Sequence, residues 1–102
     1  MPNPLLKGLP PTHPGEVLRE DVLPALGRPK AEVARLLGVS RQTLYDILNE
    51  RKPVTPQMAL RLSRLVGGAP EMWVRLQAAH DFAVIEPAIA DELAAIPQLQ
   101  AA

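Results

Sequence analysis

The sequence predicts an all-α domain of five helices over residues 14–85, with an extended N-terminal arm (residues 1–13) before it and a short helix with an acidic tail (residues 86–102) after it. Apolar residues recur at three- and four-residue spacings, and no segment keeps the period-two alternation of a half-buried strand. Glycine or proline stands near the ends of most helical segments. The 102 residues, 47% of them hydrophobic, suit one domain with a small core.

Prolines define the N-terminal arm, because four of the twelve lie within residues 1–13. Proline has no backbone N–H and restricts the residue before it, so this segment is expected to be extended. The first helix is expected to begin near Pro14, which its first turn tolerates. Pro24 is expected to kink or terminate this helix, and Gly27 to end it.

The later helices are predicted from apolar periodicity and from their caps. Gly38 is expected to close the second helix and Ser40 to cap the third, because glycine enters the left-handed region cheaply and a serine oxygen accepts from a first-turn amide. Thr55 is the expected cap of the fourth helix, and Pro87 is expected to break or restart the fifth. The helices after the first are predicted over residues 30–37, 41–48, 56–66, 70–85 and 89–96.

Two of these helices are predicted to form a helix-turn-helix over Lys30 to Asn49. A tight turn at residues 38–40 makes the helices cross steeply, which requires a small residue at their contact and apolar residues that fix the angle. Ala34 is the small residue. The residues that fix the angle are Val33, Leu37, Val39, Leu44 and Ile47. The alternative is a helical hairpin with a solvated polar face.

The outward face of the third helix carries the candidate DNA-reading residues. With Leu44, Ile47 and Leu48 assigned to the core, the side chains left for solvent or DNA are Arg41, Gln42, Thr43, Tyr45 and Asp46. Arginine pairs with guanine and glutamine with adenine through two parallel hydrogen bonds. Such motifs present the N-terminal end of this helix to base edges. Arg41, Gln42 and Thr43 are therefore the predicted base-reading residues.

Hydrogen-bond donors suited to phosphate oxygens flank this helix. The predicted contacts to the DNA backbone are Lys30, Ser40, Asn49, Arg51 and Lys52. Residues 28–52 contain six basic and three acidic side chains, although the whole chain is balanced at 11 Lys+Arg and 11 Asp+Glu. This overall balance of charge argues against a general polyanion binder. The acidic tail at residues 86–102 has three interpretations: a docking segment for a basic partner, a nucleic-acid mimic or a solubilising end.

Several function classes are not expected. The chain has no cysteine, no phosphate-binding loop and no nucleophile–base arrangement, so we expect no enzyme, no cofactor and no small-molecule substrate. His13 and His80 lie far apart in the sequence with no ligand cluster at metal spacing, so no metal site is expected; His13 is expected to shape the entry to the first helix and His80 to lie on a polar face. No apolar run approaches about 20 residues, and the proline-rich N-terminus does not resemble a signal peptide, so a cytoplasmic protein without a membrane segment is expected.

The single tryptophan, Trp73, has two interpretations. It is expected to fill the core between the fourth and fifth helices. Aromatic residues are also common anchors of protein interfaces, so the surface of a dimer or of another protein complex is the alternative.

Residues 13–85 resemble the HigA-type antitoxins of the phage-repressor-like (XRE) helix-turn-helix family. The matching stretches are HPGEVLRED at residues 13–21, LLGVSRQTL at 36–44, LNER at 48–51 and PEMWVRLQ at 70–77. The pairing of the first stretch with the tryptophan-containing stretch is more specific than the helix-turn-helix alone. Arg28 and Pro29 depart from the polar cap that is usual before the second helix.

The resemblance implies a bacterial homodimer that binds palindromic double-stranded operator DNA and represses its own operon. It also implies a protein partner, a HigB-type mRNA-cleaving toxin that the chain neutralises. By position, Arg41, Gln42 and Thr43 resemble the operator-reading residues of this family. The fifth helix and the segment after it are the expected dimer interface, because they carry more apolar residues than one small core can use. A stand-alone XRE-family regulator without a toxin is the alternative.

Overall fold

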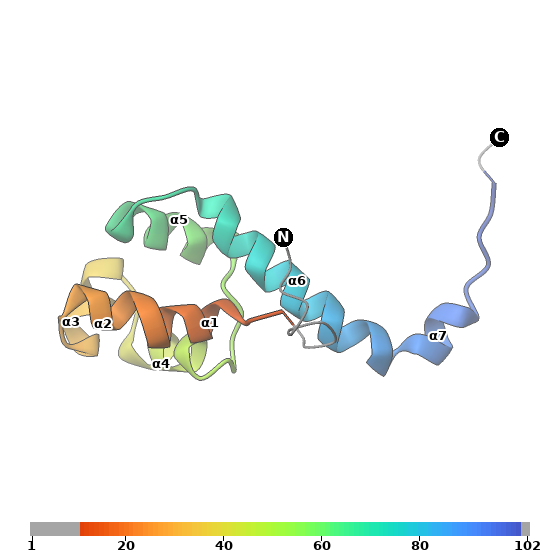
Figure 1. The fold of residues 1–102 in the computed structure, drawn as a ribbon, viewed down its shortest axis with the longest axis horizontal. Coiled ribbons are helices and arrows are strands. Elements are labelled where there is room, and N and C mark those ends of the chain that lie inside the picture. The colour runs from red at the N-terminus through yellow and green to blue at the C-terminus, as the bar shows by residue number, and fades with distance from the viewer. Residues whose placement is uncertain (1–10, 101–102) are drawn as a thin grey trace, which may run out of the picture.

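The computed structural model of the chain describes residues 11–100, and every regular element in that range is a helix (Figure 1). The all-α prediction is therefore confirmed, while residues 1–10 of the predicted arm lie outside the described residues. The elements are α1 (Pro14–Val17), η2 (Leu18–Val22), α2 (Leu23–Leu26), α3 (Lys30–Leu37), α4 (Arg41–Leu48), α5 (Pro56–Val66), α6 (Pro70–Ala88) and α7 (Ala90–Ala94).

The first three elements form one continuous helical rod, because α1, η2 and α2 follow one another without a break (Figure 1). The middle element is a π-helical segment, in which the N–H of Leu23 donates to the carbonyl of Leu18, five residues back. A proline in a regular α-helix would clash with the carbonyl four residues before it. The wider π turn accommodates Pro24, so the rod continues to Leu26 and ends where Gly27 adopts φ 64°.

The start of the rod lies directly against the end of α4. His13 caps α1, because its Nδ1 accepts a hydrogen bond of 2.9 Å from the N–H of Gly15. A Cβ atom on Gly15 would lie 1.9 Å from the carbonyl oxygen of Ile47. Only glycine therefore allows α1 and α4 to approach this closely.

The core lies between the rod and α3–α6. The helix α3 packs on α4 and α5, α5 packs on α6, and α1 contacts both α4 and α6. Trp73 is only 2% exposed, which confirms its interpretation as a core residue. The other buried hydrophobic residues are Leu18, Leu23, Val33, Ala34, Leu37, Leu44, Ile47, Leu48, Val54, Met58, Ala59 and Leu62.

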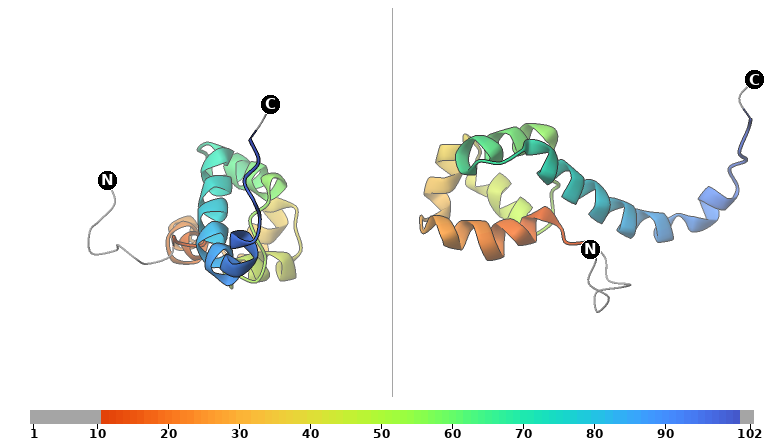
Figure 2. Two further views of the ribbon diagram at one scale, coloured as in Figure 1. Left: turned by 90° about the vertical axis from the view of Figure 1, so that its right-hand side faces the viewer. Right: turned by 45° about the horizontal axis from the view of Figure 1, so that its top comes forward.

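The C-terminal half of α6 and all of α7 project away from the other helices, as two views agree (Figures 1 and 2). Pro87 lies inside α6, which ends one residue later at Ala88, and α7 begins after Ile89. Phe82 is 70% exposed on this projection. It lines a mainly apolar groove together with Ala78, Asp81, Ile85, Glu86, Ile89 and Leu93. Among residues 11–100, no helix is long and apolar enough to cross a membrane.

The substitution Gly15→Ala tests the approach of α1 to α4. It should lower the free energy of unfolding by about 1–3 kcal/mol, because the added methyl group meets a backbone carbonyl that cannot move aside. Urea denaturation measures the loss. The neighbouring Glu16→Ala is the control, since Glu16 is exposed and its removal should change stability by about 0.5 kcal/mol or less. Equal stability of the two variants would contradict the close contact.

Stability should also depend on pH through His13. Burial, and then the nearby His80, lower the pKa of His13 below 6.5, while Glu50 and Asp81 act in the opposite direction. The unfolded chain therefore binds this proton more readily, so the contribution of His13 is full above pH 6.5 and is lost as the pH falls through the folded-state pKa. Urea denaturation between pH 7.5 and 5 should show the decrease. In His13→Asn, which keeps a capping oxygen but cannot titrate, the slope should be smaller, and an equally steep slope would refute the assignment.

Candidate nucleic-acid interface

The turn between α3 and α4 has the geometry that the sequence predicts. Gly38 adopts the left-handed conformation (φ 75°, ψ 30°), and its N–H donates to the carbonyls of Ala34 and Arg35 in the last turn of α3. A guanidinium nitrogen of Arg61, on α5, donates to the carbonyl of Leu37 at 2.9 Å. A Cβ on Gly38 would lie 2.7 Å from that same Nη1 atom. The position therefore needs glycine for its left-handed backbone conformation, and a side chain there would also displace the guanidinium of Arg61.

Ser40 caps α4 as expected. Its Oγ accepts a hydrogen bond of 3.0 Å from the N–H of Thr43 and donates to Thr43 Oγ1 at 2.9 Å. Because Thr43 Oγ1 acts as an acceptor here, its own hydroxyl proton can be donated to another group. The residues predicted to fix the angle between the helices are buried, except Val39, which is half-buried and packs against the core. The helix-turn-helix prediction is therefore confirmed in its geometry.

The N-terminal end of α4 is open to solvent. Arg41 and Gln42 are exposed, and Thr43 is half-buried beside Ser40. The Nε2 of Gln42 donates to Oδ1 of Asp46 at 2.8 Å. This bond uses one of the two amide protons and leaves the other proton and Oε1, which are the pair that adenine recognition needs.

Asp46 was expected on the outward face of α4, left for solvent or DNA, and this prediction is wrong because the residue is buried. Its exposure is 9% because the chain turns back over it after α4, where its carbonyl accepts from the N–H groups of Arg51 (2.8 Å) and Lys52 (3.2 Å). The carboxylate lies 3.4 Å from Nζ of Lys52 and 3.8 Å from Nη1 of Arg51. Asp46 therefore joins Gln42 to two of the candidate phosphate contacts.

The remaining candidates lie at the two ends of this unit. Lys30, at the start of α3, holds its Nζ 5.8 Å from the centre of the Tyr45 ring, which is 39% exposed. Asn49 is exposed at the C-terminal cap of α4. All eight predicted residues thus belong to α3, the turn, α4 or the loop after it. Hydrogen bonds join Ser40 to Thr43, and Asp46 connects Gln42 to the loop.

Three supporting interactions come from outside the helix-turn-helix, and periodicity gives no signal for them. Arg61 reaches the turn, and Arg19 donates to the carbonyl of Leu48 at 2.6 Å. The third is the ring of His80, which packs edge-on against the ring of His13 with centroids 4.9 Å apart. The stretch HPGE at residues 13–16 is the sequence signal for how α1 is positioned, because its histidine caps α1 and its glycine lies in close contact with α4.

The described residues contain no group of three or more potential metal ligands.

Comparison with known proteins identifies the fold. The helix-turn-helix family model matches residues 18–73, which include the turn and the whole of α4. The chain belongs to the helix-turn-helix family. A curated relative, virulence-associated protein I of Dichelobacter nodosus, is 37% identical over 78 residues, which cover 76% of this chain and 72% of that protein.

Solved structures narrow the relationship. The antitoxin GraA in complex with its operator is 40% identical, with a TM-score of 0.81 and 99% of both chains covered. The Pseudomonas aeruginosa antitoxin HigA with the higBA promoter is 33% identical, with a TM-score of 0.79, covering 88% of this chain and 99% of that one. This helix-turn-helix protein is thus a member of the HigA-type antitoxin group, and the resemblance inferred from sequence is confirmed.

Proposed function

We propose that this chain is an antitoxin and transcriptional repressor, which binds palindromic operator DNA as a dimer and neutralises a HigB-type mRNA-cleaving toxin. The observation that carries the proposal is the open N-terminal end of α4, with Arg41 and Gln42 exposed beside a capped helix start. The relatives that share this fold and are solved with an operator or promoter support the DNA-binding half of the proposal.

The reading residues have distinct proposed roles. Arg41 reads guanine through its paired guanidinium donors, and Gln42 reads adenine through the amide atoms that Asp46 leaves available. Thr43 donates its hydroxyl proton to a base edge or a neighbouring phosphate. Asp46 is an orienting residue, because its bond to Gln42 removes much of the rotamer freedom that binding would otherwise have to restrict.

The DNA backbone is contacted from both sides of α4. We assign phosphate contacts to Lys30, Ser40, Asn49, Arg51 and Lys52, the residues predicted from the sequence. The N-terminus of α4 adds the partial positive charge of its backbone amides. These contacts fix the register of the protein on the duplex without reading its sequence.

A second copy of the chain is the proposed partner of the projecting end of α6 and of α7. This end carries exposed apolar side chains beyond the core, among them Phe82, Ile85 and Leu93. Two-fold symmetry then sets the two α4 helices about one DNA turn apart, roughly 34–36 Å. Both proposed roles, repression and toxin neutralisation, require binding and no chemical step. Because the operator of a bacterial operon lies in the cytoplasm, the proposed repressor acts there.

Selection of bound duplexes from a random pool tests the repressor role. We expect a palindromic site, and we expect Arg41→Ala and Gln42→Ala to lose about 1–3 kcal/mol of discrimination at one base position each. Arg64→Ala and Gln57→Ala remove the same exposed side-chain types from α5 and should bind as the wild type does. Recovery of no common sequence, or unchanged discrimination in both α4 variants, would exclude base reading by α4.

Co-expression with the product of the adjacent reading frame separates the antitoxin from a stand-alone regulator. An antitoxin should copurify with a small basic ribonuclease-like chain and should suppress its cleavage of mRNA in a translation assay. A regulator without a toxin would bind the selected duplex equally well but would neither copurify with that chain nor protect mRNA. This result would leave the repressor role and remove the antitoxin role.

A further inference from the structure

The loop that follows α4 has a conformation that its own sequence does not favour. Glu50 adopts φ 62°, and it is the one residue other than glycine with positive φ between residues 11 and 100. Left-handed backbone is unfavourable for a residue with a long side chain, and asparagine or glycine is the usual occupant. Within the segment, the N–H of Glu50 donates to the carbonyl of Ile47 at 3.0 Å and the N–H of Arg51 to the carbonyl of Asp46 at 2.8 Å, the pattern that closes a helix at a left-handed residue. Because glutamate does not favour this conformation, contacts from outside the loop add to these bonds.

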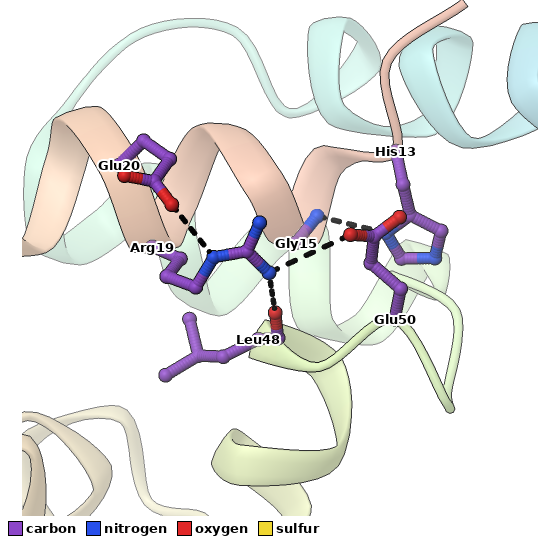
Figure 3. Close-up of polar contacts among 6 residues, drawn as sticks. All are labelled: His13, Gly15, Arg19, Glu20, Leu48 and Glu50. Atoms are coloured by element: carbon purple, nitrogen blue, oxygen red, sulfur yellow. Dashed lines mark hydrogen bonds and ion pairs between the residues drawn. The ribbon is translucent and has the colours of Figure 1, made fainter. Parts of the chain in front are cut away.

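Arg19 of η2 meets the loop at this point (Figure 3). Its Nη1 donates to the carbonyl of Leu48 at 2.6 Å and lies 3.5 Å from Oε2 of Glu50. Its Nε donates to Oε1 of Glu20 at 2.9 Å, which orients the guanidinium from the other side. One side chain thus satisfies the last carbonyl of α4 and binds the carboxylate of the strained residue.

The consequence reaches the basic end of the loop. Once residue 50 has turned the chain, the N–H groups of Arg51 and Lys52 return to the carbonyl of Asp46. Their side chains then approach the Asp46 carboxylate, beside Gln42. The direction of both basic side chains therefore depends on the turn at residue 50, which Arg19 contacts from η2 through the Leu48 carbonyl and the Glu50 carboxylate.

We infer that Arg19 is a positioning residue for DNA binding, which acts by holding the loop 49–52 so that Asn49, Arg51 and Lys52 contact the phosphate backbone. This role rests on the proposed repressor function. The side chains of Arg19 and Glu50 are 34% and 35% exposed, and ion pairs this accessible contribute little to global stability. The effect of removing Arg19 should therefore appear in the loop and in DNA binding more than in unfolding.

Three variants test the inference on the full chain with the selected duplex. Arg19→Ala should weaken binding roughly fivefold and should lower the slope of log K against log salt by about one phosphate contact, while base preference stays unchanged. Arg19→Ala with Glu50→Asn should recover most of the affinity and slope, because asparagine accepts the left-handed backbone without help. Arg19→Ala with Glu50→Gln removes the same carboxylate but lacks this preference, and it should not recover the slope.

Hydrogen exchange gives a readout that needs no DNA. In Arg19→Ala the N–H groups of Arg51 and Lys52 should exchange faster than in the wild type, those of buried Val33 and Ala34 should be unchanged, and Glu50→Asn should restore slow exchange. Equal salt slopes and equal exchange in wild type and Arg19→Ala, or equal rescue by asparagine and glutamine, would overturn the inference. If the wild-type protein binds no duplex selectively, the result contradicts the proposed repressor function, and the role of loop 49–52 at phosphate is lost with it.

Discussion

The helix-turn-helix depends on the contact between the first turn of α1 and the last turn of α4. Gly15 lies against the carbonyl of Ile47 with no room for a side chain, and His13 fixes the start of α1 by accepting from the N–H of Gly15. Because closely packed interiors transmit small displacements, a shift of α1 would tilt α4 and move its exposed end. The orientation of α4 is therefore determined at the end opposite to the one that carries the proposed base-reading residues.

Both helices of the unit are also held at their C-termini by arginines from other elements. The final carbonyl of α3, on Leu37, accepts from Arg61 of α5, and the final carbonyl of α4, on Leu48, accepts from Arg19 of η2. The last carbonyls of a helix have no partner within it, and a cation there also complements the helix dipole. Each arginine thus supplies a missing hydrogen bond and connects the helix-turn-helix to the rest of the core.

Local chemistry made much of the fold predictable from the sequence. Gly38, Ser40 and Thr55 act where they were expected, because a left-handed glycine or a capping hydroxyl needs only its chain neighbours. Interactions across the chain were not predictable in this way. The burial of Asp46 follows from a loop that folds back over it, and the meeting of His13 with His80 follows from the packing of α1 on α6. The expectation that Pro24 kinks or terminates the first helix rests on regular α-helical geometry, whereas a π turn accommodates this proline and the helical run continues to Leu26.

The order in which the chain is synthesised gives the α1–α6 contact a further consequence. The side chain of Gln77 lies 64 residues beyond His13, 3.3 Å from its ring, and donates to Asp81 on the same helix. Closing so long a loop has an entropic cost that local helix pairs such as α3 and α4 do not meet. On the ribosome, α3 and α4 can pair early, but the rod that orients them has no complete docking surface until α6 has left the exit tunnel. A nascent chain therefore acquires its DNA-facing geometry only after α6 (Pro70–Ala88) has emerged from the ribosome.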